Sequence, residues 1–146
     1  MSKNKIIQFT TIPEFLNSET LEKALIDFVS KYGFSVGKLS YNFVSKERLL
    51  KINKQFLNHD THTDIISFDY SKKNILEAEF FISMWAVRLS AKEESQSIVN
   101  ETLRVISHGV LHCIGLKDKN DTEKSKMRIK EEEFIDLFHV KHKSNV

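Results

Sequence analysis

The chain of 146 residues has little cysteine, proline or glycine: one, one and four residues respectively. A single cysteine excludes an internal disulfide, which fits a reducing compartment. The shortage of proline and glycine, without repeats or low-complexity tracts, argues against linkers and favours one domain over residues 1–146. No run approaches the roughly 20 apolar residues of a membrane span, and the first residues lack the apolar region of a signal peptide. We therefore expect a cytoplasmic protein without membrane contact.

A strong excess of one charge is also absent, because 22 basic and 20 acidic residues give a net charge of +2. This balance does not by itself indicate nucleic-acid binding, so a phosphate-binding surface would have to come from local clustering. One such cluster follows Ser45 at nearly helical spacing and comprises Lys46, Arg48, Lys51 and Lys54. These side chains form either a solvated helix face or an RNA contact.

Two histidines, His108 and His112, stand four residues apart in an apolar segment that is predicted to be helical. On an α-helix such residues are about 40° apart around the axis and about 6 Å apart along it, so both imidazoles can face one point. Gly115 is predicted to end the helix in the left-handed conformation, which lets Asp118 return to that point. Two imidazoles and a carboxylate leave a position open for water, as in catalytic zinc sites. The pattern predicts one zinc ion, with iron, nickel or cobalt as alternatives.

Gly109, directly after the first histidine, argues against ordinary peptidase chemistry. Zinc peptidases of the H-E-x-x-H type carry a glutamate there as general base. A glycine inside a helix costs about 1 kcal/mol relative to alanine, so we expect a packing chain or a substrate close to the helix backbone. The base would then be a metal-bound hydroxide, a substrate phosphate oxygen or a residue from elsewhere.

Cys113 points about 100° away from His112 and is predicted to belong to the core, with a sulfur ligand as the alternative.

The segment from His108 to Asp118 resembles the H-G-x-L-H-x-x-G-x-D-H signature of the YbeY family of bacterial metal-dependent endoribonucleases, which act in ribosomal RNA maturation. A second block, residues 52–68, is similar to the family's L-N-x-x-Y-R-x-x-D-x-x-T-D-V-L-S-F stretch. Residues 79–83 give a third, less specific match to G-D-I-x-I-S. The matches keep the family's order and spacing and cover most of the chain.

The resemblance implies a single-strand-specific endoribonuclease that acts in ribosomal RNA maturation, including late processing of the 16S rRNA 3′ end, and in ribosome quality control. It implies RNA as substrate and the ribosome or small-subunit proteins as partners. It also implies that Asn53, Asp64 and Ser67 shape the cleft or position the substrate. No residue is predicted as the general base.

Two positions depart from the family's pattern. The family's third ligand histidine falls at Asp118, where a carboxylate is an ordinary zinc ligand but lowers the charge of the site by one unit and makes a bound water less acidic. The family's arginine falls at Leu57, which cannot clamp a phosphate. If the protein is catalytic, another cation must bind the phosphate in its place. The sequence does not indicate which of three candidates does so: Lys51, Lys54 or Arg88.

Two other functions stay open. Leu57 favours a non-catalytic assembly factor that binds RNA or the ribosome and uses its metal structurally. A hydrolase of another ester or amide is disfavoured by Gly109.

The chain has four further histidines, which are candidate site residues. His59 and His62 are predicted to lie in a polar loop, either near the substrate or on the surface without a role. His139 and His142 are predicted to lie in a frayed C-terminal tail and to have no role.

Hydrophobic spacing predicts an α+β fold, with a small four-stranded mixed sheet covered by about five helices. The metal site would lie on a buried helix and the turn after it. The expected strands are residues 5–9, 38–44, 64–68 and 79–83. The expected helices are residues 18–32, 45–56, 84–91 and 98–114, and one that starts at residue 120.

Overall fold

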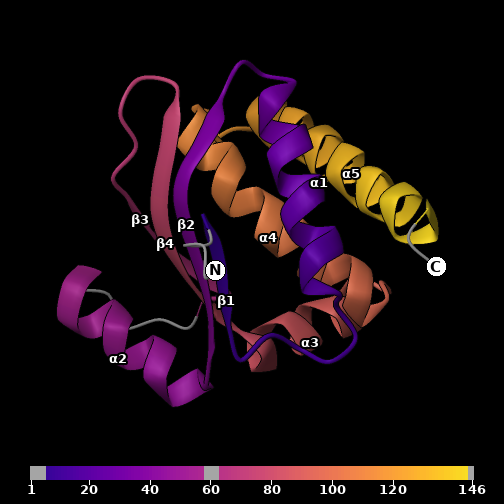
Figure 1. The fold of residues 1–146 in the computed structure, drawn as a ribbon. Coiled ribbons are helices and arrows are strands. Elements are labelled where there is room, and N and C mark those ends of the chain that lie inside the picture. Colours follow the sequence, from indigo (N-terminus) through magenta and orange to yellow (C-terminus); the bar gives the residue numbers. More distant parts are fainter. Residues whose placement is uncertain (1–5, 58–62, 145–146) are drawn as a thin grey trace, which may run out of the picture.

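The computed structural model describes residues 6–57 and 63–144 of the chain. Figure 1 shows the arrangement of the elements within these ranges. The strands are β1 (Ile7–Thr10), β2 (Ser35–Val44), β3 (Ile65–Asp69) and β4 (Ile75–Ser83). The helices are α1 (Ser18–Ser30), α2 (Lys46–Leu57), α3 (Met84–Glu93), α4 (Ile98–Ile114) and α5 (Asp121–Ser144).

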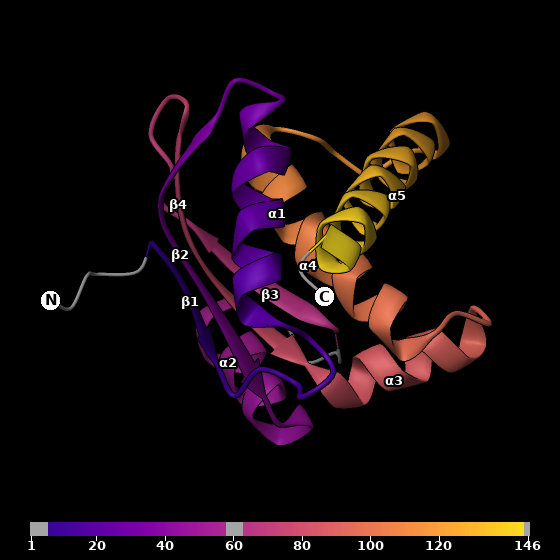
Figure 2. The same cartoon turned by 45° about the vertical axis from the view of Figure 1, so that its right-hand side comes forward.

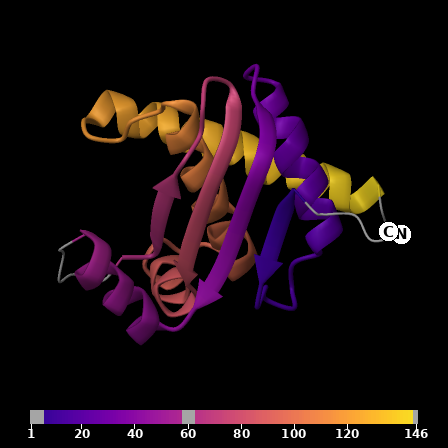
Figure 3. The same cartoon turned by 60° about the vertical axis from the view of Figure 1, so that its left-hand side comes forward.

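The strands form one mixed sheet in the order β1-β2-β4-β3. Strands β1, β2 and β4 run parallel, while β3 pairs antiparallel with β4 at the edge of the sheet. Helices α1, α4 and α5 cover one face (Figure 2), and α2 lies on the other face beside the β3 edge (Figure 3). The predicted α+β class, with a four-stranded mixed sheet and five helices, is confirmed.

The core lies between the sheet and α4, because alternate residues of the central strands face this helix. Tyr41 of β2 and Phe80 of β4 are fully buried and stack with ring centroids 4.6 Å apart. The Tyr41 hydroxyl donates a hydrogen bond to the Ile106 carbonyl of α4, at 3.5 Å. The apolar face of α4 is therefore held against the centre of the sheet, which fixes the direction of its remaining side chains.

Several elements extend beyond their predicted bounds, and β4 and α5 show the largest extensions. Strand β4 begins at Ile75 instead of residue 79, with Leu76 and Ala78 buried and Glu77 and Glu79 exposed between them. This alternation is that of a strand with one covered face. The acidic side chains point to the face opposite α4, and the sequence prediction included only the last part of this strand, from residue 79.

The expectation of a frayed C-terminal tail is wrong for His139 and His142, since both lie within α5. The α5 helix packs on α1 and α4 through buried Phe134 and Phe138. The His139 Nε2 atom lies 2.7 Å from Asn100 Oδ1 on α4, and the His142 ring stacks on Phe138. A helix persists as long as its apolar face has a partner. The other two histidines, His59 and His62, lie outside the described residues.

No helix in the described part of the chain combines the length and the apolar character that crossing a membrane requires.

Candidate metal centre

The α4 helix and its C-terminal turn bring three polar side chains together. Ser97 caps the start of the helix by accepting a hydrogen bond from the Asn100 N–H, at 3.0 Å. Gly115 ends it with φ 117°, in the left-handed region, and its N–H donates to the carbonyls of Leu111 and His112. The predicted turn is confirmed. It reverses the chain so that Asp118 faces the two histidines.

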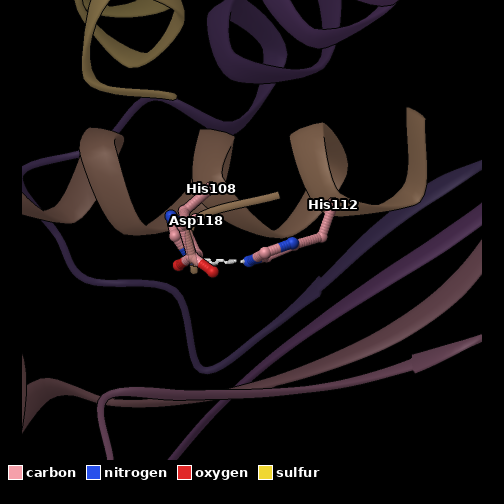
Figure 4. Close-up of side chains that lie close together, drawn as sticks. All are labelled: His108, His112 and Asp118. Atoms are coloured by element: carbon pink, nitrogen blue, oxygen red, sulfur yellow. Dashed lines mark hydrogen bonds and ion pairs between the residues drawn. The ribbon is translucent and has the colours of Figure 1, made fainter. Parts of the chain in front are cut away.

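Figure 4 shows the side chains of His108, His112 and Asp118 converging beside α4. The two histidine Nε2 atoms are 2.9 Å apart. Asp118 Oδ2 lies 3.3 Å from the first and 3.5 Å from the second. Tetrahedral ligand atoms at about 2.1 Å from an ion lie about 3.4 Å from one another. The two distances to Asp118 fit one ion, and the two histidine Nε2 atoms would have to move slightly apart to hold it.

The group is open to solvent on one side. The His108 side chain is 22% exposed, and those of His112 and Asp118 are each 38% exposed. One ligand atom from each residue falls within 4.8 Å of the others. Three ligands with an accessible side describe a group that could hold a metal ion together with water or substrate.

Each histidine has a hydrogen-bond partner behind it. His108 Nδ1 lies 2.7 Å from Oε2 of Glu131, a buried α5 residue, and His112 Nδ1 lies 3.0 Å from the Leu116 carbonyl. A carbonyl only accepts, so His112 donates from Nδ1; a carboxylate partner favours the same tautomer for His108. Both Nε2 atoms are then left as bases that face Asp118. Such outer partners orient metal-binding histidines and raise their basicity.

Glu131 belongs to a buried charge network that sequence reasoning missed. The Arg104 Nη1 atom lies 3.5 Å from Glu131 Oε1, and the same guanidinium pairs with Glu101, which is fully buried. Ser90 Oγ donates to Glu101 at 2.8 Å. Burial raises the pKa of Glu101, but the hydrogen bonds from Arg104 and Ser90 outweigh it and hold the pKa below its ordinary value. The network is therefore charged and connects α4 to α5 directly behind His108.

Replacing Glu131 by glutamine should weaken metal binding by about 10- to 100-fold, as outer-shell changes do. Glutamine keeps the shape and an accepting oxygen but removes the negative charge that supports His108. Competition against a chromogenic chelator measures the change. Glu132→Gln, an exposed position next to it on α5, is the matched control. Equal affinities in the two variants would contradict an electrostatic role for Glu131.

Of the predicted cleft residues, Asp64 lies beside the histidines. A cavity of about 50 Å³ is lined by Asp64, Arg104 and His108, with Ile65 and Val105. This volume admits a water molecule. Burial raises the pKa of Asp64, and the charges of Arg104 and His108 offset this only in part.

Ser67 and Asn53 are placed differently. Ser67 shares one side of β3 with Ile65, whose Cδ1 approaches Gly109, and with Asp69, which interacts with Cys113. By strand alternation Ser67 therefore faces α4. Asn53 is buried in α2, on the other face of the sheet. Among the described residues, those that line the cavity beside His108 include neither Ser67 nor Asn53.

None of the three cations suggested as substitutes for the family's arginine lines that cavity, within the part of the chain that the structure describes. They are exposed on α2 and α3: Lys51, Lys54 and Arg88. Leu57 is 40% exposed at the end of α2. Arg104 does line the cavity, but it pairs with Glu101 and Glu131.

Gly109 and Cys113 belong to the packing of α4. A Cβ atom at Gly109 would lie 2.7 Å from the Phe80 ring and 3.1 Å from Ile65, so the expected close neighbour is the protein core. Cys113 is half-buried against the core. Burial, together with the charge of Asp69, raises the pKa of its thiol to about 12, which disfavours a thiolate ligand.

This fold and this group define the class: a small α+β protein in which the buried helix α4 and the turn after it present a His-His-Asp cluster. The family model described as Endoribonuclease YbeY matches residues 3–139. The Endoribonuclease YbeY of Flavobacterium johnsoniae is 44% identical over 123 residues, which cover 82% of this chain and 88% of the relative. That of Christiangramia forsetii is 42% identical over 145 residues, covering 96% and 99%.

One solved structure has a similar fold. The solution structure of a Thermotoga maritima protein superposes with a TM-score of 0.64 at 25% identity, over 95% of this chain and 93% of that one. The chain belongs to the YbeY family.

Proposed function

We propose that this protein is a single-strand-specific, metal-dependent endoribonuclease of ribosomal RNA maturation, acting in late processing of the 16S rRNA 3′ end and in ribosome quality control. The observation that carries the proposal is the His-His-Asp group, with its ligand atoms within 4.8 Å, in a chain of the YbeY family. The relatives named endoribonucleases support RNA as substrate. The activity would reside in one domain over residues 1–146, in the cytoplasm, with the ribosome or small-subunit proteins as partners.

The ligands in this proposal are His108, His112 and Asp118, and the ion is zinc, with iron, nickel or cobalt as alternatives. When bound, such an ion polarises a phosphodiester oxygen and acidifies a coordinated water. Glu131 and the Leu116 carbonyl keep the two imidazoles oriented toward that position. The carboxylate of Asp118 lowers the charge of the site by one unit relative to a third histidine, so the water is less acidic than in a three-histidine site.

Asp64 would position water or substrate, because it lines the cavity that adjoins His108. Ser67 would face the substrate from β3. Asn53, buried in α2 on the other face of the sheet, would help to shape the cleft from a distance. No general base is assigned among these residues.

A second candidate function is a non-catalytic assembly factor that binds RNA or the ribosome around a structural metal. The observation that favours it is that, among the described residues, none of the three suggested substitutes for the family's arginine lines the cavity beside His108. Leu57 stands where the family has arginine, and Arg104 is engaged by two carboxylates. A phosphate at the metal centre would then lack the arginine clamp that the family's pattern supplies.

The deciding experiment compares chelator-treated protein with the same protein reloaded with zinc, iron, nickel or cobalt. The substrates are a single-stranded RNA, a duplex of the same sequence and a structured 16S rRNA 3′ segment. We expect metal-dependent cutting, faster on the single strand. Cutting that resists the chelator would contradict the metal mechanism. RNA binding without cutting would favour the assembly factor, and faster turnover of a peptide would favour the other hydrolase.

A further inference from the structure

Helix α3 exposes an apolar surface close to the metal centre. Trp85 is 43% exposed and Leu89 is 45% exposed, one helical turn apart. They line a shallow pocket of about 370 Å³ together with polar neighbours that include Thr63, Asp64 and Ser90. Neither the fold nor the proposed metal chemistry accounts for two large apolar side chains in water at this place.

Asp64 joins this pocket to the metal centre, because it lines both the pocket on α3 and the small cavity beside His108. The Asp64 carbonyl accepts a hydrogen bond from the Ser83 N–H, at 3.0 Å. Ser83 caps α3 and stands two residues before Trp85, so this bond holds Asp64 next to the start of the helix. A ligand that stacks on Trp85 would therefore lie close to a metal ion or substrate bound at His108 and His112.

Basic side chains surround the tryptophan. The Lys46 Nζ atom, at the start of α2, lies 4.2 Å from the centre of the Trp85 ring. Arg88 and Lys92 are exposed three and seven residues after Trp85, on the same side of α3. An exposed aromatic ring bordered by cations is the arrangement with which proteins bind single-stranded nucleic acid: bases stack on the ring and phosphates meet the cations.

The acidic residues of the pocket suit a base better than a phosphate. Asp64 and Glu93 line it, and a carboxylate repels a phosphate but accepts hydrogen bonds from exocyclic amino groups, as it does from cytosine N4. The phosphate is then directed to the basic side of the ring and the base to the pocket side. Because a duplex hides the faces of its bases, only a single strand can use such a surface.

We propose that Trp85, Leu89 and Lys46, together the α3 platform, bind one nucleotide of single-stranded RNA adjacent to the phosphodiester held at the metal centre. The base stacks on Trp85 and Leu89, and Lys46 contacts its phosphate. The inference rests on the proposed function and names the subsite through which that function selects unpaired RNA.

Trp85 is the single tryptophan of the chain, so its fluorescence reports directly on stacking. The test titrates a short single-stranded RNA into the His112→Ala protein, in which cutting is blocked, and follows tryptophan emission and, separately, the anisotropy of a label on the RNA. We expect saturable quenching, and a loss of affinity of about 10-fold or more in Trp85→Ala. Trp85→Phe should keep most of the affinity, and Lys46→Gln should reduce the salt dependence of binding by about one phosphate contact.

Tyr70→Ala is the matched control. Tyr70 is an aromatic residue directly after β3 and is 55% exposed. It follows β3 at the end that pairs with Ala78, whereas Trp85 follows β4 beyond Ile82, so the two lie on the order of 15 Å or more apart. Its removal should leave RNA affinity unchanged.

Unquenched emission, or equal RNA affinity in Trp85→Ala and Tyr70→Ala, would overturn the inference. Binding of a ribosomal protein that depends on Trp85, without quenching by RNA, would overturn it in favour of a protein-binding surface. Failure of the nuclease proposal has a different result: quenching and the Trp85 effect persist, but metal-loaded wild-type protein does not cut. Cutting by wild-type protein with the same KM in Trp85→Ala would leave the nuclease standing and reject the platform.

Discussion

Replacing His112 by alanine is expected to lower metal affinity by at least about 10³-fold and to abolish metal-dependent cutting of RNA, with little effect on stability. Loss of an outer partner alone costs about 10- to 100-fold, so loss of one of three ligands should cost more. The side chain is 38% exposed, and within the part of the chain that the structure describes, its hydrogen bond outside the cluster is to the Leu116 carbonyl. Water can take over that carbonyl, so the fold keeps its hydrogen bonds.

His108→Ala would be a poorer test, although it removes an equivalent ligand. His108 also satisfies Glu131, which is 2% exposed and shares Arg104 with Glu101. Its removal leaves a buried carboxylate with one partner fewer, which costs stability as well as metal affinity. An inactive His108 variant could therefore be inactive for two reasons, whereas an inactive His112 variant has one.

The measurement pairs metal affinity with cutting of a single-stranded RNA, and thermal unfolding of the metal-free protein monitors the fold. His142→Ala makes the same change at an exposed position of α5, outside the cluster, and should keep wild-type metal affinity and cutting even though it removes the ring stacked on Phe138. Full cutting activity in His112→Ala would reject the metal centre as the site of reaction. Lost affinity with unchanged cutting would assign the metal a structural role.

The parts of this centre that the sequence predicted are those determined by local structure. Helical spacing alone places His108 and His112 on one face, and the left-handed Gly115 makes the turn that returns Asp118. The apolar positions of α4 predicted burial for the same reason, because a helix that is apolar around most of its circumference must be covered.

The parts that the sequence did not reveal depend on contacts between distant segments. Glu131 lies 23 residues after His108, on a helix whose rotation is set by packing, so no spacing rule connects the two. Arg104 could have been found, since it lies four residues before His108 on the same face of α4. An arginine on a helix is usually solvated, however, and only the structure shows that Arg104 is mostly covered and pairs with Glu101 and Glu131.

The second large effect concerns Gly109, where alanine should destabilise the protein by about 2 to 3 kcal/mol, as overpacking of a core does. Helix propensity predicts the opposite sign, a gain of about 1 kcal/mol. The difference arises from the Phe80 ring, whose atoms would lie 2.7 and 2.8 Å from the new methyl group. The ring cannot move aside, because it is fully buried and stacked on Tyr41. Either α4 shifts away from the sheet or the stack breaks.

A double-mutant cycle with Phe80→Leu separates this clash from any other effect of the substitution. The smaller side chain makes room for the methyl group, so the double variant should be more stable than the sum of the two single changes predicts, by about 1 to 2 kcal/mol. Chemical denaturation of the metal-free proteins measures the four stabilities. Metal affinity should follow the same pattern, falling in Gly109→Ala and recovering in the double variant, because the position of α4 sets where His108 points. Additive stabilities would mean that the glycine serves an approaching substrate and not the packing of α4 on β4.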